Sequence, residues 1–363
     1  MTKENTESNR HNTLILIGNG FDLAHEMPIY KFYDEKLSTS YRDFIISQIL
    51  KDFIYQNLDD TNLASYPRYL KFDNPKGDKK VISTDMYSLL RSGANLNNKE
   101  YKILNSFFGH LMNIQKLKGW VDIECEYFDL LTFLFETGGD IFKFNEEFSL
   151  IIEGLKKHLQ DIEINIKKEC KPKAEIQAHF DEIIQQYTDI GNVQILNFNY
   201  TSTPELYLTQ YENRVEVNYI HGKLFDEQNP IIFGYGDEAH PKYKQIEDSG
   251  NKDYLKFLKS YAYLQTNNYH NFLRFIDSDN FDVVIMGHSC GMSDGVMLKT
   301  IFEHPNCQNI IIKYYQYINN EGKAINDFFV KTQEIARHFS DKAMFRKKVL
   351  PISNPAVTPL IPV

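Results

Sequence analysis

The chain has 363 residues, of which 42% are hydrophobic and 14% aromatic. This composition excludes an intrinsically disordered protein, and the length suits two or three folding units or one domain with a large insertion. The formal net charge of −9 argues against binding to nucleic acid, because proteins that bind nucleic acid normally present a basic surface to the phosphates.

Cysteine spacing and hydropathy predict which metal sites and which cellular compartment the protein has. The four cysteines are widely spaced and form no Cys-x-x-Cys pair, so we expect no structural zinc site and no bound metal. No apolar run reaches about 18 residues and the chain starts with a polar stretch, which predicts neither a membrane span nor a secretory signal. Reduced thiols then favour a cytoplasmic protein without membrane contacts.

The first 190 residues predict one strand followed by a helical insertion. The apolar run at residues 14–17 is typical of a strand buried on both faces, and a polar tail over residues 1–12 precedes it. Helical periodicity then dominates an inserted region over residues 38–190. We expect helices at residues 40–58, 98–117, 122–136, 144–168 and 174–187, and a surface loop at residues 66–85.

The second half of the chain predicts the rest of a parallel sheet. Short β-rich runs lie at residues 193–198, 215–220, 231–233, 283–286 and 310–315, with helical segments between several of them. Such alternation implies crossover connections, so we expect an α/β, Rossmann-like domain formed by residues 13–37 and 191–340. The proline-rich residues 349–363 predict an extended tail on the surface.

Ligands of open parallel sheets bind beyond the carboxyl ends of the strands, where this sequence places four polar turns. The first is Gly18-Asn19-Gly20-Phe21-Asp22, whose glycines would let the backbone approach a phosphate or ribose closely. The alternative is a type I′ hairpin, which Asn-Gly favours. The continuously apolar run before this turn is not the alternating pattern of a hairpin strand.

The second and third turns carry amide, hydroxyl and imidazole groups. Residues 197–203 include Asn199, Tyr200 and Thr201. The Asn and Thr side chains of this turn would hold ligand hydroxyls or, alternatively, form Asx turns and cap a helix near Pro204. In the third turn, His221 precedes Gly222 at a strand end. Its ordinary pKa near 6.5 suits proton transfer, whereas the alternative is a histidine bonded to backbone groups.

The fourth turn, residues 287–294, follows a strand and precedes a helix. Gly287, His288 and Ser289 are candidates for ribose or phosphate contacts at this helix start. The same letters also fit the Gly-x-Ser-x-Gly nucleophile elbow of α/β-hydrolases. That alternative requires a later histidine, for which His338 is the candidate.

These turns, taken in order with two further segments, resemble a known family. The further segments are Ser38-Thr39-Ser40-Tyr41-Arg42-Asp43-Phe44 and Trp120-Val121-Asp122-Ile123-Glu124. The set resembles the landmarks of the bacteriophage abortive infection family AbiH, and Gly-Asn-Gly-Phe-Asp is its most specific part. The pattern is similar, more remotely, to sirtuins and to sirtuin-like NAD hydrolases of bacterial immunity.

The resemblance implies a sirtuin-like sheet that binds NAD as substrate or ligand. It implies catalytic roles for His221, Asn199 and Asp22. The implied NAD-binding residues are Gly18, Asn19, Gly20, Phe21, Asp22, Tyr200, Gly222, Gly287, His288 and Ser289. The four-cysteine zinc module of sirtuin deacylases is absent from this sequence, which favours NAD cleavage over deacylation.

The function expected from the resemblance is anti-phage defence. The chain would hydrolyse NAD at the nicotinamide glycosidic bond on infection, with homo-oligomerisation or a phage-derived trigger as the switch. One alternative is a non-catalytic nucleotide sensor that acts through a protein partner, and another is a toxin for which the sheet is only a scaffold. The segment of Trp120, Asp122 and Glu124 would supply a lid residue or simply an acidic helix start.

Overall fold

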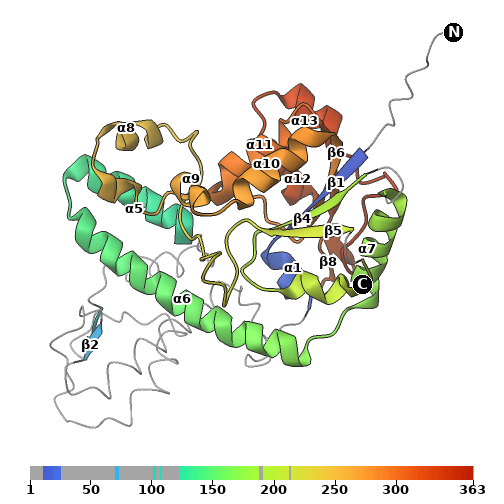
Figure 1. Cartoon of the computed structure of the whole chain (residues 1–363), viewed down its shortest axis with the longest axis horizontal. Helices are drawn as coiled ribbons and strands as arrows, with labels where there is room; N and C mark the ends of the chain where they lie inside the picture. The colour runs from blue at the N-terminus through green and yellow to red at the C-terminus, as the bar shows by residue number, and fades with distance from the viewer. Residues whose placement is uncertain are drawn as a thin grey trace.

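The computed structural model describes residues 11–25, 70–72, 101–103, 107, 123–187, 191–211 and 214–362. At its centre lies a parallel five-stranded sheet in the order β5-β4-β1-β6-β7 (Figure 1). Its strands are β1 (His11–Ile17), β4 (Val193–Asn197), β5 (Val215–Tyr219), β6 (Asn280–Met286) and β7 (Cys307–Lys313). Counted within the sheet, this order is 3-2-1-4-5, a doubly wound arrangement that reverses direction between β1 and β6.

The sheet is buried on both faces, as the continuous apolar runs predict. Leu14 and Leu16 face one side and Ile15 and Ile17 the other, since successive side chains of a strand point in opposite directions. The first side packs against α10 (Asn268–Ser278), α11 (Gly295–Phe302), α12 (Phe328–Arg337) and α13 (Lys342–Lys348). The second packs against α7 (Ala174–Tyr187). Burial of these apolar side chains is the main stabilising term of the domain.

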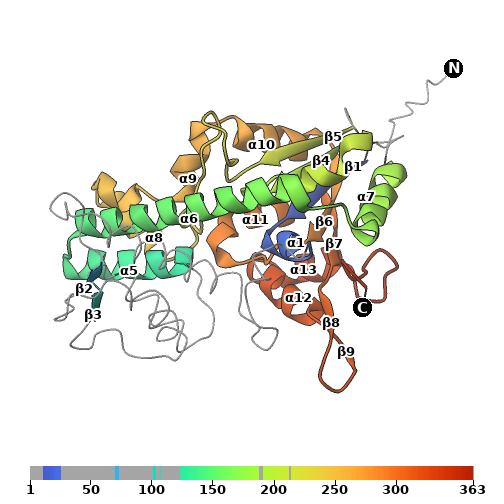
Figure 2. The same cartoon turned by 90° about the horizontal axis from the view of Figure 1, so that it is seen from below.

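The helical block comprises α5 (Ile123–Thr137), α6 (Ile141–Glu169) and α8 (Tyr243–Asp248). Figures 1 and 2 show it on the side of the sheet where α1 (Asn19–Leu23) lies, and α6 runs from the block to the sheet. Stacked aromatic pairs join its segments: the ring centroids of Tyr127 and Phe148 lie 4.0 Å apart, as do those of Phe128 and Tyr235. The block therefore has its own apolar core beside the sheet.

Smaller elements complete the described chain. They are the strand pairs β2 (Leu70–Phe72) with β3 (Tyr101–Ile103) and β8 (Gln316–Ile318) with β9 (Ala324–Asn326), the helix α9 (Lys259–Ala262), and short 3₁₀ helices at Thr203–Tyr207, Thr209–Tyr211, Lys252–Leu255, Tyr263–Gln265 and Met292–Asp294. Within the described residues, none of the helices combines the length and apolar character that crossing a bilayer requires.

Most predicted elements of the described region are confirmed, and two predictions are wrong. The helices expected at 122–136, 144–168 and 174–187 are α5, α6 and α7. Residues 101–103, expected to be helical, form β3, because Tyr-Lys-Ile also has the apolar-polar-apolar pattern of a strand. The expected strand at 231–233 is a loop. It crosses the end of β5 against Gly222, directly after Pro230, which has no N–H to donate.

Three predictions fall wholly or mostly on undescribed residues. The helix expected at 40–58 and most of that expected at 98–117 lie outside the described residues. In the surface loop expected at 66–85, the described residues 70–72 form β2.

The C-terminal segment, residues 349–362, lies along the outer edge of β7. The Leu350 N–H donates to the Ile310 carbonyl at 3.0 Å. Further along, the Tyr314 N–H donates to the Thr358 carbonyl, and the Leu360 N–H donates back to the Tyr314 carbonyl at 2.8 Å. These bonds pair backbone groups that an edge strand otherwise leaves open.

Candidate functional site

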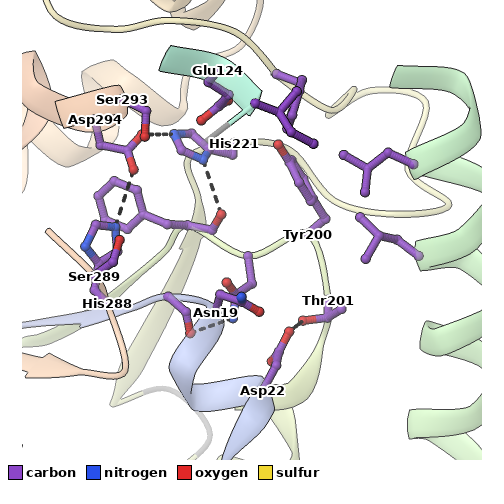
Figure 3. Close-up of a pocket in the computed structure, with 17 residues that line it drawn as sticks. Asn19, Asp22, Glu124, Tyr200, Thr201, His221, His288, Ser289, Ser293 and Asp294 are labelled. Carbon is purple, nitrogen blue, oxygen red and sulfur yellow. Dashed lines mark hydrogen bonds and ion pairs between the residues drawn. The ribbon is translucent and has the colours of Figure 1, made fainter. Parts of the chain in front are cut away.

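A cleft opens between the carboxyl ends of the strands and the helical block. Its empty volume is about 880 Å³, which includes open solvent at its mouth. Its lining residues are Gly18, Asn19, Asp22, Ile123, Glu124, Leu155, Leu159, Phe198, Asn199, Tyr200, Thr201, His221, Phe233, His288, Ser289, Ser293 and Asp294 (Figure 3). The cleft therefore lies where the doubly wound order reverses, at β1 and β6.

The turn after β1 is a strand-to-helix turn, so the hairpin interpretation is wrong. Gly18 is extended, with φ −134°, and α1 begins at Asn19. A Cβ on Gly18 would lie 2.7 Å from the His288 Cα, and a Cβ on Gly20 would lie 2.7 Å from the Gly287 oxygen. The Gly20 N–H donates to that oxygen at 2.8 Å. These glycines allow the turns after β1 and β6 to pack on each other.

The predicted site residues divide between the cleft and the packing around it. The cleft is lined by Gly18, Asn19, Asp22, Asn199, Tyr200, His221, His288 and Ser289. Gly20, Phe21, Gly222 and Gly287 do not line it. The Phe21 ring is fully buried against Phe180 and Tyr207, and Gly222, at φ +88°, packs on the backbone of Pro230.

Asp22 presents a buried carboxylate with one oxygen that lacks a hydrogen-bond partner. The residue is 3% exposed, and its Oδ2 accepts a hydrogen bond from the Thr201 hydroxyl at 2.6 Å. Oδ1 has no hydrogen-bond partner among the described residues. Burial raises the pKa of Asp22 to about 6, against the lowering effects of the Thr201, Thr203 and Asn199 side chains. The group is thus largely ionised at neutral pH and able to accept a bond from a ligand.

The turn after β4 is held by its own amide side chains. The Asn199 N–H donates to the Asn197 Oδ1 at 3.0 Å, which forms the Asx turn that the sequence offered as an alternative. The Asn199 side-chain nitrogen donates to the Gly18 carbonyl at 2.9 Å and ties this turn to the first. The Tyr200 hydroxyl donates to the Ile232 carbonyl at 3.0 Å, which fixes the ring at the cleft wall.

His221 uses both ring nitrogens. Nδ1 lies 3.2 Å from the Phe198 carbonyl, which can only accept, so this nitrogen carries the proton of the neutral ring. Nε2 lies 3.1 Å from the Tyr263 hydroxyl and 3.3 Å from the Asp294 Oδ1. Burial and the nearby Lys259 ammonium lower the pKa of His221, against the opposite effect of Asp294. The imidazole is therefore neutral, and its Nε2 faces Tyr263 and Asp294.

A buried ammonium organises the groups around His221. Lys259 is 1% exposed, and its Nζ lies 2.7 Å from the Asp294 Oδ1, 3.0 Å from the Glu124 Oε2 and 3.2 Å from the Ser293 carbonyl. The Lys259 ammonium holds the pKa of Asp294 well below its usual range despite burial. We call Glu124, Lys259, Asp294 and His221 the ion network.

The helical block joins the cleft through two carboxylates. Glu124, at the start of α5, also accepts from the Gly234 N–H at 2.9 Å, so its two oxygens bond two different loops. Glu163 of α6 accepts from the Ser202 N–H at 2.9 Å. Ser202 is the N-cap residue of the 3₁₀ helix at Thr203–Tyr207, and its side chain makes no capping bond. The α5 and α6 helices are therefore anchored on the sheet by hydrogen-bonded acids.

The turn after β6 does not form a hydrolase elbow. Cys290, and not Ser289, has the left-handed backbone conformation, with φ 57°. The His338 Nε2 donates to the Cys290 carbonyl at 2.8 Å, so this nitrogen has no lone pair for Ser289. The Cys290 N–H donates to the His288 Nδ1 at 3.0 Å, which leaves the Nε2–H of His288 directed at Asp294. Burial raises the pKa of the Cys290 thiol to about 12.

Sequence reasoning missed the centre of the ion network. Lys259 and Ser293 were not singled out, and Asp294 was included in the fourth turn without a role. The only local signal is an acidic residue in a polar turn before a helix. Trp120 and Asp122 lie outside the described residues. Among the described residues, no group of three or more His, Cys, Asp or Glu side chains is placed to hold a metal ion.

Comparison with known proteins places the chain in a family. A search of curated proteins found no match. Residues 14–316 match the family model described as "Bacteriophage abortive infection AbiH". The matched region begins in β1, ends in β8 and includes every residue that lines the cleft. Because the match covers most of the sequence, this chain belongs to the AbiH family, whose role is bacteriophage abortive infection.

Proposed function

We propose that this protein binds NAD in the cleft and hydrolyses its nicotinamide glycosidic bond during phage infection. The observation that carries the proposal is Asp22, a buried carboxylate directly after the central strand, one oxygen of which has no hydrogen-bond partner among the described residues. An oxygen in this position accepts ribose hydroxyls and stabilises positive charge that develops on the sugar. The resemblance to sirtuin-like NAD hydrolases supports the same ligand.

The surrounding side chains fit a ribose and an aromatic base. Asn199 and Thr201 flank Asp22 with further polar atoms, and the Tyr200 ring offers an aromatic surface at the cleft wall. Ser289 is exposed at the turn after β6, where the sirtuin resemblance places the adenosine ribose. These groups would hold the sugar and the reacting water in a productive orientation, which is the main requirement of this reaction.

The proposed reaction is a substitution at the anomeric carbon. The bond from C1′ to the pyridinium nitrogen breaks, and its electron pair stays on that nitrogen, so nicotinamide leaves as a neutral molecule. A water oxygen bonds to C1′, and the water loses one proton. NAD and water thus give nicotinamide, ADP-ribose and a proton, with no oxidation or reduction.

His221 is suited to receive that proton. An imidazole accepts a proton only in its neutral form, and burial lowers the pKa of His221. Its Nε2 lone pair would bond the water once the Tyr263 hydroxyl rotates away. The imidazolium formed would then be stabilised by Asp294, whose Oδ1 lies 3.3 Å from Nε2.

A second candidate is a nucleotide sensor that does not cleave its ligand. The observation that favours it is that both His221 nitrogens are engaged by protein groups. In a sensor, the ion network would transmit ligand binding to α5 through Glu124, and the helical block would present the result to a phage-derived trigger, a protein partner or a second copy.

Nicotinamide release from NAD tests the proposal. The purified chain is compared with its His221→Ala and Asn199→Ala variants, with and without phage lysate, and each fold is checked by circular dichroism. Loss of a general base lowers turnover by about 100- to 10,000-fold. His270→Ala, an exposed histidine on α10, is the matched control and should retain full activity. Folded His221→Ala with full activity would overturn its role, and bound NAD recovered intact would favour the sensor.

A further inference from the structure

The hairpin of β8 and β9 projects from the body of the molecule and has apolar side chains on both faces (Figure 2). The rings of Tyr315 and Tyr317 stack on one face, with 5.8 Å between their centroids, and Ile318 lies on the other. Tyr315 is 62% exposed, Tyr317 43% and Ile318 52%. A hairpin of two strands is marginally stable in water without further strands or a helix against it, so these exposed faces indicate a partner.

The two edges of the hairpin differ. On the β8 side, the backbone of Tyr314 already pairs with the C-terminal segment, because its N–H donates to the Thr358 carbonyl and its carbonyl accepts from the Leu360 N–H. On the β9 side, Ala324 and Asn326 are exposed. The β9 edge is therefore the one with room for a further strand.

The bonding pattern of the hairpin directs the backbone groups of Ala324 and Asn326 outward. The Asp327 N–H donates inward, to the Tyr315 carbonyl of the neighbouring strand. Inward bonds of an antiparallel pair recur at every second residue, so Ile325 also bonds inward, and the residues on either side of it present N–H and C=O groups to the outside.

We propose that two copies of this chain pair through β9 and form a continuous four-stranded antiparallel sheet. A twofold axis at Ile325 places Ala324 of each copy opposite Asn326 of the other, and each such pair exchanges two backbone hydrogen bonds. The same register places Lys323, just before β9, opposite Asp327 of the second copy, just after it. Opposite charges that face each other across strands favour pairing, so this edge is complementary to itself in both hydrogen bonds and charge.

Pairing through β9 also joins the apolar faces of the two hairpins. Tyr317 lies opposite Ile325 within each hairpin, so the four-stranded sheet would carry these two side chains from both copies in one row. Symmetric pairing through β8 is less favourable, because a twofold axis at Tyr317 would place Tyr315 opposite Asn319 and bring no opposite charges together. The β9 edge therefore fits a second copy better than the β8 edge does.

The proposed contact lies close to the cleft. Asp327, at the end of the hairpin, lies 4.0 Å from the Lys331 ammonium of α12. That ammonium donates to the carbonyl of His288, which lines the cleft, at 2.9 Å. Pairing at β9 would thus occur beside a side chain that contacts the cleft turn in each copy. The proposal does not depend on the reaction proposed for the cleft.

Disulfide crosslinking of the full chain tests the register. At the twofold axis, the two Ile325 Cα atoms would lie about 4.5 Å apart, within the disulfide range of about 4.4–6.8 Å. We expect Ile325→Cys to form a covalent dimer when oxidised glutathione accepts the two electrons and two protons of the thiols. Tyr317→Cys, on the same face of the outer strand, is the matched control. Its two copies would lie about 14 Å apart, three strand spacings, and should not crosslink.

Sedimentation velocity over a range of concentrations tests the edge. The original chain should form a dimer at high concentration and dissociate on dilution. Ala324→Pro removes an outward N–H without removing a bond inside the hairpin, and should weaken dimerisation at least about tenfold. Gln316→Pro makes the same change on the outer side of β8 and should leave dimerisation unchanged.

The outcomes are decisive for the paired edge. A chain that stays monomeric at every concentration overturns the proposal. So does a dimer that Ala324→Pro does not weaken, where circular dichroism shows the variant to be folded. Crosslinking of Ile325→Cys without crosslinking of Tyr317→Cys supports the proposal even where Ala324→Pro does not fold, and the reverse pattern overturns it.

Discussion

The two sides of the cleft are built by different means. On the sheet side, Gly18, Gly20 and Gly287 bring the turns after β1 and β6 into backbone contact, and the polar groups sit on those turns. On the block side, Leu155 and Leu159 supply an apolar wall from α6, and the anchoring acids lie near helix surfaces. The sheet side has little freedom to adjust, whereas the block side depends on a few bonds that a change of charge can weaken.

The polar groups of the cleft differ in how fully the protein itself bonds them. The carboxylate oxygens of Glu124 are bonded by Lys259 and by a backbone N–H, and Lys259 itself has three acceptors. The Asp22 Oδ1 has no hydrogen-bond partner in the part of the chain that the structure describes. Substitution of Glu124 or Lys259 should therefore lower the stability of the fold, whereas substitution of Asp22 by a neutral residue should raise it.

The largest expected effect comes from Gly287→Ala, because it breaks the packing of the sheet side. Gly287 has φ +77°, and an added Cβ would lie 2.1 Å from the Phe21 backbone nitrogen. Gly138, between α5 and α6, has φ +73° with no atom within 4 Å of an added Cβ, so Gly138→Ala isolates the effect of φ. We expect Gly138→Ala to cost about 1–2 kcal/mol of unfolding free energy and Gly287→Ala at least about 3 kcal/mol more. Equal losses in denaturant unfolding would disprove the packing argument.

Lys259→Met removes the ammonium that holds the ion network together, and should have the second-largest effect on stability. The substitution leaves Glu124 and Asp294 without their ammonium in a buried position. Breaking a buried ion pair in this way costs about 3–5 kcal/mol. Chemical denaturation measures the loss, and Lys252→Met, at an exposed position nearby, should change stability by less than about 0.5 kcal/mol. A loss no greater than that of the control would show that the network does not stabilise the fold.

Asp22→Asn should stabilise the protein at neutral pH. The folded-state pKa of Asp22 is about 6 against an ordinary value of 3.8, so the folded chain disfavours the ionised form by about 3 kcal/mol. For an acid with a raised pKa, this penalty is absent below about pH 4 and grows as the pH rises through about 6. The difference in unfolding free energy between variant and original chain should follow that course. A difference between the two chains that is the same at pH 4 and at pH 8 contradicts the prediction.

Glu124→Gln should have the smallest effect of the four. Lys259 retains Asp294 and the Ser293 carbonyl, and glutamine can still accept from the Gly234 N–H. We expect a loss of about 2 kcal/mol, the usual value for a hydrogen bond to a charged group. Compared with the original chain, the variant should show faster amide hydrogen exchange at the start of α5, while exchange in α7 should be unchanged. Glu136→Gln, an exposed acid on α5 paired with Lys242, should lose less than about 1 kcal/mol.

The local elements were predictable because their patterns are local. The bounds of α7 follow from its helical periodicity, and the five strands of the sheet follow from short apolar runs. The turns at strand ends were predictable as well, since parallel strands end at one edge. The order of the strands required the structure, because sequence patterns do not show which runs become neighbours.

The ion network could not be predicted in the same way. Lys259 pairs with Glu124 across 135 positions and with Asp294 across 35, and neither partner is marked by a periodic pattern. The glycines illustrate a different limit. Gly18 and Gly20 were expected to approach a ligand, but their space is occupied by His288 and Gly287, a contact that depends on the neighbouring strand.

The C-terminal segment covers the edge of the sheet at which another β-strand could pair. β7 is the last strand of the sheet, and Leu350, Thr358 and Leu360 pair with its outer edge. A chain ending at residue 348 would leave that edge open to a strand from a second copy. The segment thus opposes concentration-dependent self-association through β7, so any assembly that accompanies infection would use another surface or first displace residues 349–362.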